Sequence, residues 1–166
     1  IKRMIMAEER NTIYLCLAHM SEEGIEQKYV KEAFDTNWVV PMGPNVNAFE
    51  QNLADFANSN SDGSKLDRKV VCLSAGTAAV HLALLACGVG SGDEVCVQSF
   101  TFCASSHPIT YLGASPVFID SEKETWNMDP ALLEKAIIER KEKTGKYPKA
   151  IVPVALYGMP YKVDEI

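Results

Sequence analysis

"VVCLSAGTAAVHLALLACGVGSGDEV", residues Val70–Val95, is the stretch of this 166-residue chain that decides the expected fold. It places a Ser-Ala-Gly-Thr turn, residues 74–77, between an apolar run and an Ala/Leu-rich segment. Residues 69–74 predict a short buried strand, residues 77–88 a helix that ends at a glycine, and residues 92–98 the next strand. This order of elements is typical of a parallel sheet.

The alternation of strand and helix continues along the chain. A helix is expected over residues 101–113 and strands over residues 115–121 and 147–156. The helix expected over residues 127–145 has clear end signals: Asp129 as N-cap, Pro130 at the first helical position and Gly145 as the stop. Strands that read as continuous Val/Ile/Cys runs between helices indicate an α/β fold, a mostly parallel sheet with helices on both faces.

The first 65 residues have a different pattern. Two helices are expected there, over residues 21–37 and 45–60, joined by the loop "WVVPMGP" at residues 38–44. The predicted organisation is therefore an N-terminal helical segment, residues 1–65, followed by the first part of an α/β domain, residues 66–166. Because the chain stops just after a buried-looking strand, we expect it to be part of a longer protein.

Composition and charge exclude several classes of partner. The net charge is −6 and no block of Lys or Arg forms a basic stripe, so neither nucleic acid nor an anionic membrane is expected to bind. The longest apolar stretch, residues 78–89, is shorter than the roughly 20 residues that span a bilayer. No secretory signal is evident at the N-terminus, and five cysteines without CxxC spacing are typical of free thiols, so a cytoplasmic location is expected.

The turn at residues 74–77 has two interpretations. A strand that enters a helix through small residues leaves several backbone N–H groups directed at one spot, with the positive end of the helix dipole behind them. Thr77 adds a hydroxyl, and Gly76 lets a bulky anion approach closely, so a phosphate could bind there. Alternatively, Ser74 or Thr77 is an ordinary N-cap at a tight turn.

Other sequence patterns give weaker signals. "GVGSGDE", residues 88–94, is not G-x-G-x-x-G and follows a helix, and no GxxxxGK[ST] occurs, so neither nucleotide-binding loop is expected. The histidines have no metal-ligand spacing, and no metal is expected. Cys103 and His107 would share one face of the helix expected there, which allows either a thiolate–imidazole pair or two packed residues.

Charged and aromatic residues also lie at the predicted strand ends. The carboxylates there, Asp93, Glu94 and Asp120, are expected to be solvated. Phe100 and Phe102 follow the second strand, where ligands of open α/β sheets bind. Either ring could stack on a flat cofactor, or both could serve packing.

Four segments together resemble the DegT/DnrJ/EryC1/StrS aminotransferases. They are "NWVVPMGPNVNAFE", "LSAGTAAVHLALLACGVGSGDEV", "SFTFCASSHPITYLGASPVFID" and "AIVPVALYGMP", in this order, within a match over residues 14–166. The resemblance implies a pyridoxal-phosphate enzyme with the aspartate-aminotransferase fold that acts on nucleotide-linked keto-sugars.

The resemblance also implies roles for particular residues. The turn Ala75-Gly76-Thr77 matches the family's phosphate cradle, and Phe102 matches the aromatic residue that stacks on the pyridine ring. The loop that contains Trp38 and Gly43 matches a segment near the substrate entrance of the family dimer. This chain has Ala155 where the family often has histidine, so the contribution of that histidine is missing here.

The family's Schiff-base lysine and the acid beneath its pyridine nitrogen would both lie beyond Ile166. The resemblance therefore implies the N-terminal part of a homodimeric enzyme that converts a keto-sugar to an amino sugar with an amino-acid donor, glutamate. The chain alone is predicted to be inactive. Two alternatives stay open: a non-catalytic relative that binds the cofactor or a sugar nucleotide as a regulator, and an unrelated α/β domain that binds a phosphorylated ligand.

Overall fold

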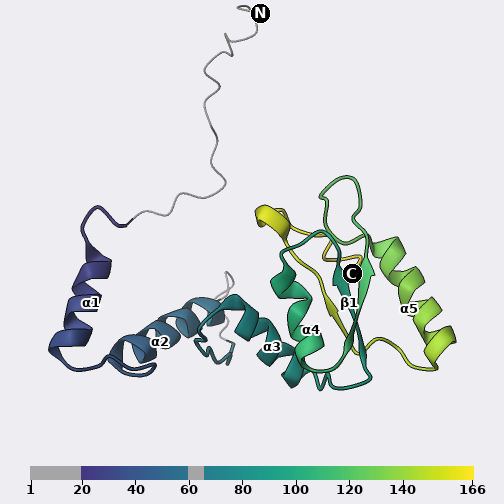
Figure 1. Ribbon diagram of the computed structural model, residues 1–166. Helices are drawn as coiled ribbons and strands as arrows, with labels where there is room; N and C mark the ends of the chain where they lie inside the picture. The colour runs from purple at the N-terminus through teal and green to yellow at the C-terminus, as the bar shows by residue number, and fades with distance from the viewer. Residues whose placement is uncertain (1–19, 60–65) are drawn as a thin grey trace, which may run out of the picture. The chain divides into compact units, whose positions relative to one another are not determined.

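The computed structural model describes residues 20–59 and 66–166, which fall into two compact units (Figure 1). The first unit is Ile1–Cys72 and the second is Leu73–Ile166, and each is described by itself. The expectations for residues 1–19, which include Cys16, one of the five cysteines, lie outside the described residues.

The first unit contains the two helices that the sequence predicts. Helix α1 spans Ile25–Asp35 and helix α2 spans Pro44–Asn58. Before α1, the Ser21 hydroxyl accepts the N–H of Ile25 at 3.0 Å, while the Glu26 carboxylate accepts the N–H of Ser21 at 2.9 Å. This reciprocal pair satisfies backbone donors at the helix start in the manner of a capping box. Helix α2 begins at a proline, whose missing N–H costs nothing in the first turn.

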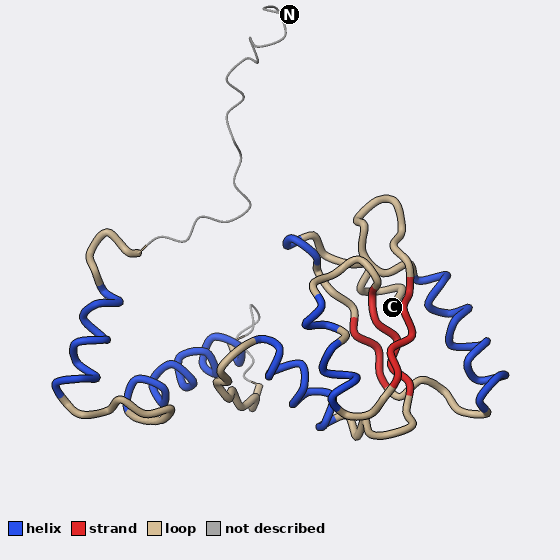
Figure 2. The backbone as a smooth tube through the Cα atoms, viewed as in Figure 1, coloured by secondary structure: helices blue, strands red, loops and turns tan. Residues whose placement is uncertain are grey.

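The second unit is built on a parallel sheet in the order β2-β1-β3. The strands are β1, Glu94–Gln98; β2, Ser115–Ile119; and β3, Ala150–Val152. Helices α3, Gly76–Ala86, and α4, His107–Tyr111, lie on one side of the sheet and α5, Pro130–Thr144, on the other (Figure 2). The α/β architecture with helices on both faces is therefore confirmed.

The alternation of side chains along β1, the central strand, explains why apolar clusters lie on both faces of the sheet. Val95 and Val97 of β1 point to one face and pack with Leu84 of α3 and Ile109 of α4. Cys96 points to the other face and packs with a second cluster that includes Leu133 of α5. Successive side chains of a strand alternate between faces, so a continuous apolar run is what a sheet covered on both sides requires.

The expected strand over residues 69–74 is wrong. These residues form no strand, and the N–H of Cys72 donates to the Glu50 carboxylate at 2.8 Å instead of to a neighbouring strand. Val71 is 65% exposed, although the apolar pattern predicts burial. A strand needs a hydrogen-bonding neighbour, and in the described chain none of the strands β1 to β3 pairs with this run.

The helix expected over residues 101–113 is broken. A 3₁₀ turn, Cys103–Ser105, is followed by the short helix α4, with Pro108 in its first turn. Cys103 and His107 therefore lie in separate elements, and the shared helix face expected for them is wrong. The strand expected over residues 147–156 is reduced to β3, and a second 3₁₀ turn follows at Leu156–Gly158.

The end signals of α5 are confirmed. Asp129 Oδ1 accepts the N–H groups of Ala131 at 2.8 Å and Leu132 at 3.1 Å, Pro130 occupies the first turn, and Gly145 ends the helix with a φ of +77°.

None of the helices in residues 20–59 and 66–166 combines the length and the hydrophobicity that crossing a bilayer requires.

Candidate functional site

The candidate site lies at the carboxyl end of the parallel strands. Helix α3 packs on β1, and it also contacts the 3₁₀ turn Cys103–Ser105, which follows the carboxyl end of that strand. The 11 residues of α3 span about 16 Å, as do the five residues of β1. Ligands of open α/β sheets bind at this edge.

The turn before α3 is open and uncapped. Ala75 is at the N-cap position with extended backbone, and among residues 20–59 and 66–166 no side chain accepts a hydrogen bond from the first turn of the helix. The interpretation of Ser74 or Thr77 as an ordinary N-cap is therefore wrong. Ser74, Ala75 and Gly76 are exposed, and a Cβ added to Gly76 would meet no atom within 4 Å. The unpaired N–H groups at this helix start thus have room for an anion.

Phe102 presents its ring to solvent from the loop after β1. It precedes the 3₁₀ turn Cys103–Ser105 and is 73% exposed, so its ring does not serve packing within the second unit. Phe100 is half-exposed instead and lies beside Trp126, with 6.1 Å between the ring centroids. Within residues 66–166 no hydrogen bond joins Phe102 to the turn at residues 74–77.

Trp38 and Gly43 belong to the first unit. Gly43 has a φ of +131°, and a Cβ there would lie 3.0 Å from Trp38 Cε3, so the indole needs a glycine at this position. The two residues line a cavity of about 110 Å³ in the bend between α1 and α2. That this loop lies near the substrate entrance, as the family resemblance implies, stays a prediction.

The carboxylates at the strand ends are not all solvated. Glu94 pairs with Arg140 of α5, whose Nε donates to Glu94 Oε2 at 2.8 Å and whose second nitrogen, Nη2, contacts Oε1. That hydrogen bonding raises the pKa of Arg140 above its usual value. The expectation of a solvated turn carboxylate is wrong for Glu94, which joins β1 to α5. Asp93 accepts the N–H of Gly90 at 3.0 Å and closes the turn before β1.

Sequence reasoning missed two buried polar residues at the same edge. Gln98 at the end of β1 and Asn127 before α5 are both fully buried and hydrogen-bonded to each other at 3.2 Å. The signal available in the sequence was a glutamine that ends an apolar strand at a position where burial is expected. In the described part of the chain, no three His, Cys, Asp or Glu side chains gather as metal ligands would.

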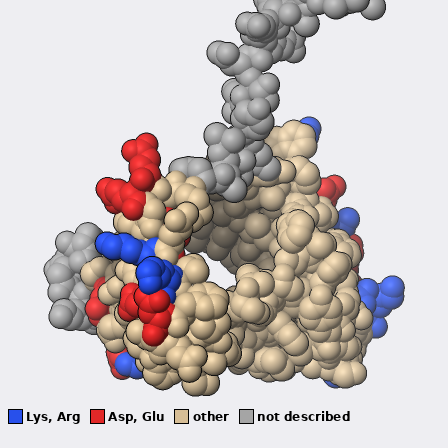
Figure 3. All heavy atoms as spheres, turned by 60° about the vertical axis from the view of Figure 1, so that its left-hand side comes forward, with Lys and Arg blue, Asp and Glu red and all other residues tan. Residues whose placement is uncertain are grey.

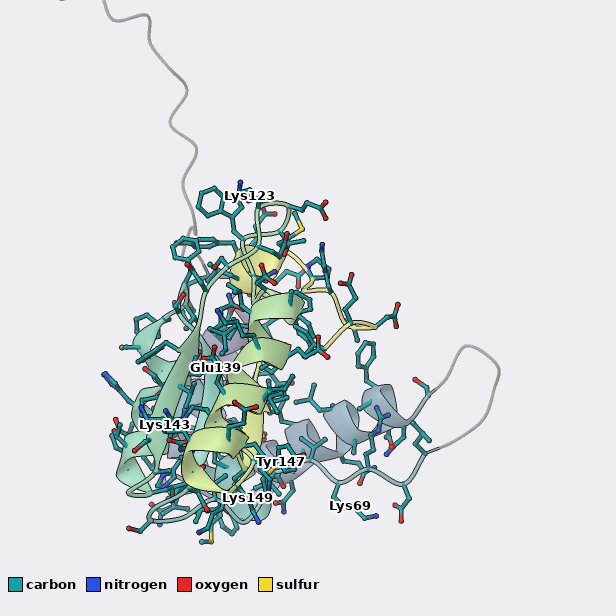
Figure 4. All side chains as sticks on the ribbon, turned by 90° about the vertical axis from the view of Figure 1, so that its right-hand side faces the viewer. Lys69, Lys123, Glu139, Lys143, Tyr147 and Lys149 are labelled. Atoms are coloured by element: carbon teal, nitrogen blue, oxygen red, sulfur yellow. The ribbon has the colours of Figure 1, made fainter. Side chains whose placement is uncertain are left out.

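Lysines of the second unit lie at both ends of the sheet. Lys143 and Lys149 lie near the start of β3, at the end opposite the loop that carries Lys123 (Figure 4). Lys162 follows β3 and donates to Glu124 at 3.1 Å, and this hydrogen bond raises the pKa of Lys162.

The sequence profile of the DegT/DnrJ/EryC1/StrS aminotransferase family matches residues 20–166. The chain belongs to this family. EpsN of Bacillus subtilis (strain 168) is 49% identical over 154 residues, 93% of this chain and 37% of EpsN. The GDP-perosamine synthase of Caulobacter vibrioides is 40% identical over 144 residues, 87% of this chain and 35% of that enzyme.

Solved structures of the DegT/DnrJ/EryC1/StrS family agree with the fold. NtdA from Bacillus subtilis, with bound cofactor PMP, has a TM-score of 0.71 and 26% identity over 89% of this chain and 31% of NtdA. The predicted family and its α/β aminotransferase fold are thus confirmed, with pyridoxal phosphate as the family's cofactor. The chain spans about a third of the length of these relatives.

Proposed function

We propose that this chain is the N-terminal part of a pyridoxal-phosphate aminotransferase that converts a nucleotide-linked keto-sugar to an amino sugar. The observation that carries the proposal is the exposed, uncapped first turn of α3, the helix that packs on β1. The amino donor is an amino acid, glutamate in this proposal. The similarity to a GDP-perosamine synthase supports a nucleotide-linked sugar as the acceptor.

The residues of this chain fit a cofactor that joins a phosphate to an aromatic ring. The N–H groups at Ala75 and Gly76 and the Thr77 hydroxyl would hold the phosphate, and Phe102 would cover one face of the ring. The helix dipole adds about 0.3–1 kcal/mol for a phosphate at an exposed helix start. When bound, the cofactor supplies an electron-withdrawing ring. The part of this chain is to bind and orient that ring.

Substrate and partner assignments complete the proposal. The loop with Trp38 and Gly43 would contact the substrate, and the enzyme would be a cytoplasmic homodimer. On the face shown in Figure 3, basic side chains are interspersed with acidic ones and form no continuous basic stripe. This distribution, with the net charge of −6, supports a small-molecule substrate rather than nucleic acid or a membrane surface.

Cysteine footprinting tests the cofactor position. Cys103 is exposed and adjoins Phe102, whereas Cys87 is exposed at the far end of α3. With pyridoxamine 5′-phosphate at ten times its Kd, we expect iodoacetamide to modify Cys103 about tenfold more slowly, because only the ligand-free fraction reacts. Peptide mass mapping reports each cysteine separately.

The same footprint contains its own controls. The rate at which iodoacetamide modifies Cys87 should not change when the ligand is added. Burial raises the pKa of the Cys96 thiol to about 11, so it stays protonated at pH 8 and should not react with or without ligand. If the ligand slows modification of Cys87 and Cys103 equally, or slows neither, the cofactor does not bind beside Phe102.

The chain alone should lack transaminase activity. The family resemblance implies that the Schiff-base lysine lies beyond Ile166, and the chain spans about a third of the length of its relatives. Incubated with cofactor and glutamate, the 166-residue chain should release 2-oxoglutarate no faster than cofactor alone, while the full-length gene product releases it stoichiometrically. Release of 2-oxoglutarate by the 166-residue chain itself would contradict the prediction that this chain is inactive. If the full-length gene product binds the cofactor but releases no 2-oxoglutarate, the result would instead favour the alternative of a non-catalytic regulator.

A further inference from the structure

Two fully buried amide side chains lie beneath the loop that carries Phe102. Gln98 ends β1, and Asn127 precedes α5. Burying an amide is costly unless its polar atoms are hydrogen-bonded, and an apolar residue of similar volume would avoid that cost. Their hydrogen bonds therefore indicate what these two residues do.

Gln98 fixes the backbone before Phe102. Its Nε2 donates to the carbonyl of Phe100 at 2.8 Å and to Asn127 Oδ1 at 3.2 Å, and its Oε1 accepts the N–H of Met128 at 3.0 Å. One side chain thus ties the aromatic loop to the segment that leads into α5. Both hydrogens of its NH₂ group are used.

Asn127 fixes a second segment at the same edge. Its Oδ1 also accepts the N–H of Leu156 at 3.0 Å, and its Nδ2 donates to the carbonyl of Met159 at 2.8 Å. The turn between these residues contains Tyr157 at a φ of +53°, a conformation that costs free energy for a bulky side chain. Asn127 therefore closes a strained turn that begins next to Ala155.

We propose that Gln98 and Asn127 are positioning residues that fix the Phe102 loop and the turn after Ala155 relative to each other before the cofactor binds. This proposal rests on the proposed function, because it assigns Phe102 to the cofactor ring. The amide form is essential, since each side chain donates and accepts at once. A carboxylate at position 98 would face two oxygen acceptors, Phe100 O and Asn127 Oδ1, and would release the loop.

Two isosteric variants separate the two halves of this arrangement. Gln98→Glu removes both donors from the Phe102 side, so we expect it to weaken pyridoxamine 5′-phosphate binding by about tenfold or more. Asn127→Asp keeps both hydrogen bonds that Oδ1 accepts and places its second oxygen against the Met159 carbonyl, on the side of the turn rather than of Phe102, so it should weaken binding less than Gln98→Glu does. Gln27→Glu, the same change on the exposed surface of α1, is the matched control and should have no effect. Calorimetry gives each affinity.

A role in packing alone makes a different prediction: affinity would then fall in step with thermal stability in both variants. Gln98→Met, which has similar length and no charge, should also weaken binding about tenfold and covers a failure of Gln98→Glu to fold. Binding within twofold of the unmodified chain by either folded variant at position 98 would overturn the proposal.

Hydrogen exchange tests the positioning without cofactor. In the unmodified chain the N–H groups of Met128 and Leu156 should be protected, because each donates to a buried side chain. Gln98→Met should remove protection at Met128, and Asn127→Ala at Leu156. Unchanged protection would refute the positioning role. If exchange responds as expected but the unmodified chain fails to bind the ligand, the proposed function fails instead.

Discussion

Replacing Gly76 by aspartate should lower the affinity for pyridoxamine 5′-phosphate by about 100-fold or more, because two like charges a few ångströms apart repel by several kcal/mol near a protein surface. The new carboxylate would stand at the exposed helix start that we assign to the phosphate. It would compete for the same N–H groups and repel the ligand.

The same substitution should stabilise the fold. Gly76 does not have a positive φ, and its added Cβ would meet no atom within 4 Å. Aspartate is slightly more favourable than glycine in a helix, and a carboxylate in the first turn contributes a further 0.3–1 kcal/mol or so. The free energy of unfolding should therefore rise while ligand affinity falls. A substitution that merely damaged the second unit would lower both the free energy of unfolding and the ligand affinity.

Two controls separate charge from shape in the aspartate result. Gly76→Ala adds the Cβ without the charge and should retain most of the affinity. Ala83→Asp adds the same charge to an exposed position of α3 about 10 Å from Gly76 along the helix axis, where the repulsion is screened and the effect of the dipole has fallen off, and should bind normally. Equilibrium dialysis gives the affinities and urea titration the stabilities. Binding by Gly76→Asp within threefold of the unmodified chain would show that the phosphate does not occupy this turn.

Features encoded within one segment were predictable from the sequence. The cap at Asp129, the start at Pro130 and the stop at Gly145 each act on neighbours within a few residues, and all three hold in the structure. The alternation of helices with apolar runs similarly predicted the parallel sheet, because β1 must be apolar on both faces.

Features that depend on distant partners were not predictable in this way. The apolar run at residues 69–74 has the composition of a strand, but strand formation depends on a neighbour that local sequence does not specify. Glu94 lies 46 residues from Arg140, and Gln98 lies 29 residues from Asn127. In the candidate site, the family resemblance singled out Phe102, whereas the sequence did not indicate that Gln98 would pair with Asn127 beneath the Phe102 loop.

Ile109 tests how strongly tertiary packing holds the short helix that follows the Phe102 loop. A five-residue helix has little stability of its own, so α4 must depend on its contacts. Ile109 is fully buried among Leu84 of α3 and Val95 and Val97 of β1. Ile109→Ala should lower the free energy of unfolding by about 2–5 kcal/mol through lost burial and a cavity, whereas Ile109→Val should cost about 0.5–1.5 kcal/mol.

Ile138 is the matched control for the Ile109 prediction. It lies on α5 with half of its surface exposed, so Ile138→Ala removes the same atoms from a site that solvent can fill and should cost far less than Ile109→Ala. Urea titration with equal m-values for the variants would establish that the comparison is of stability alone. Because Ile109 anchors the element that follows the 3₁₀ turn after Phe102, its loss should also increase hydrogen exchange at Ser105 and Ser106, whose N–H groups bond within that turn. Equal destabilisation by Ile109→Ala and Ile138→Ala would show that α4 does not depend on this buried cluster.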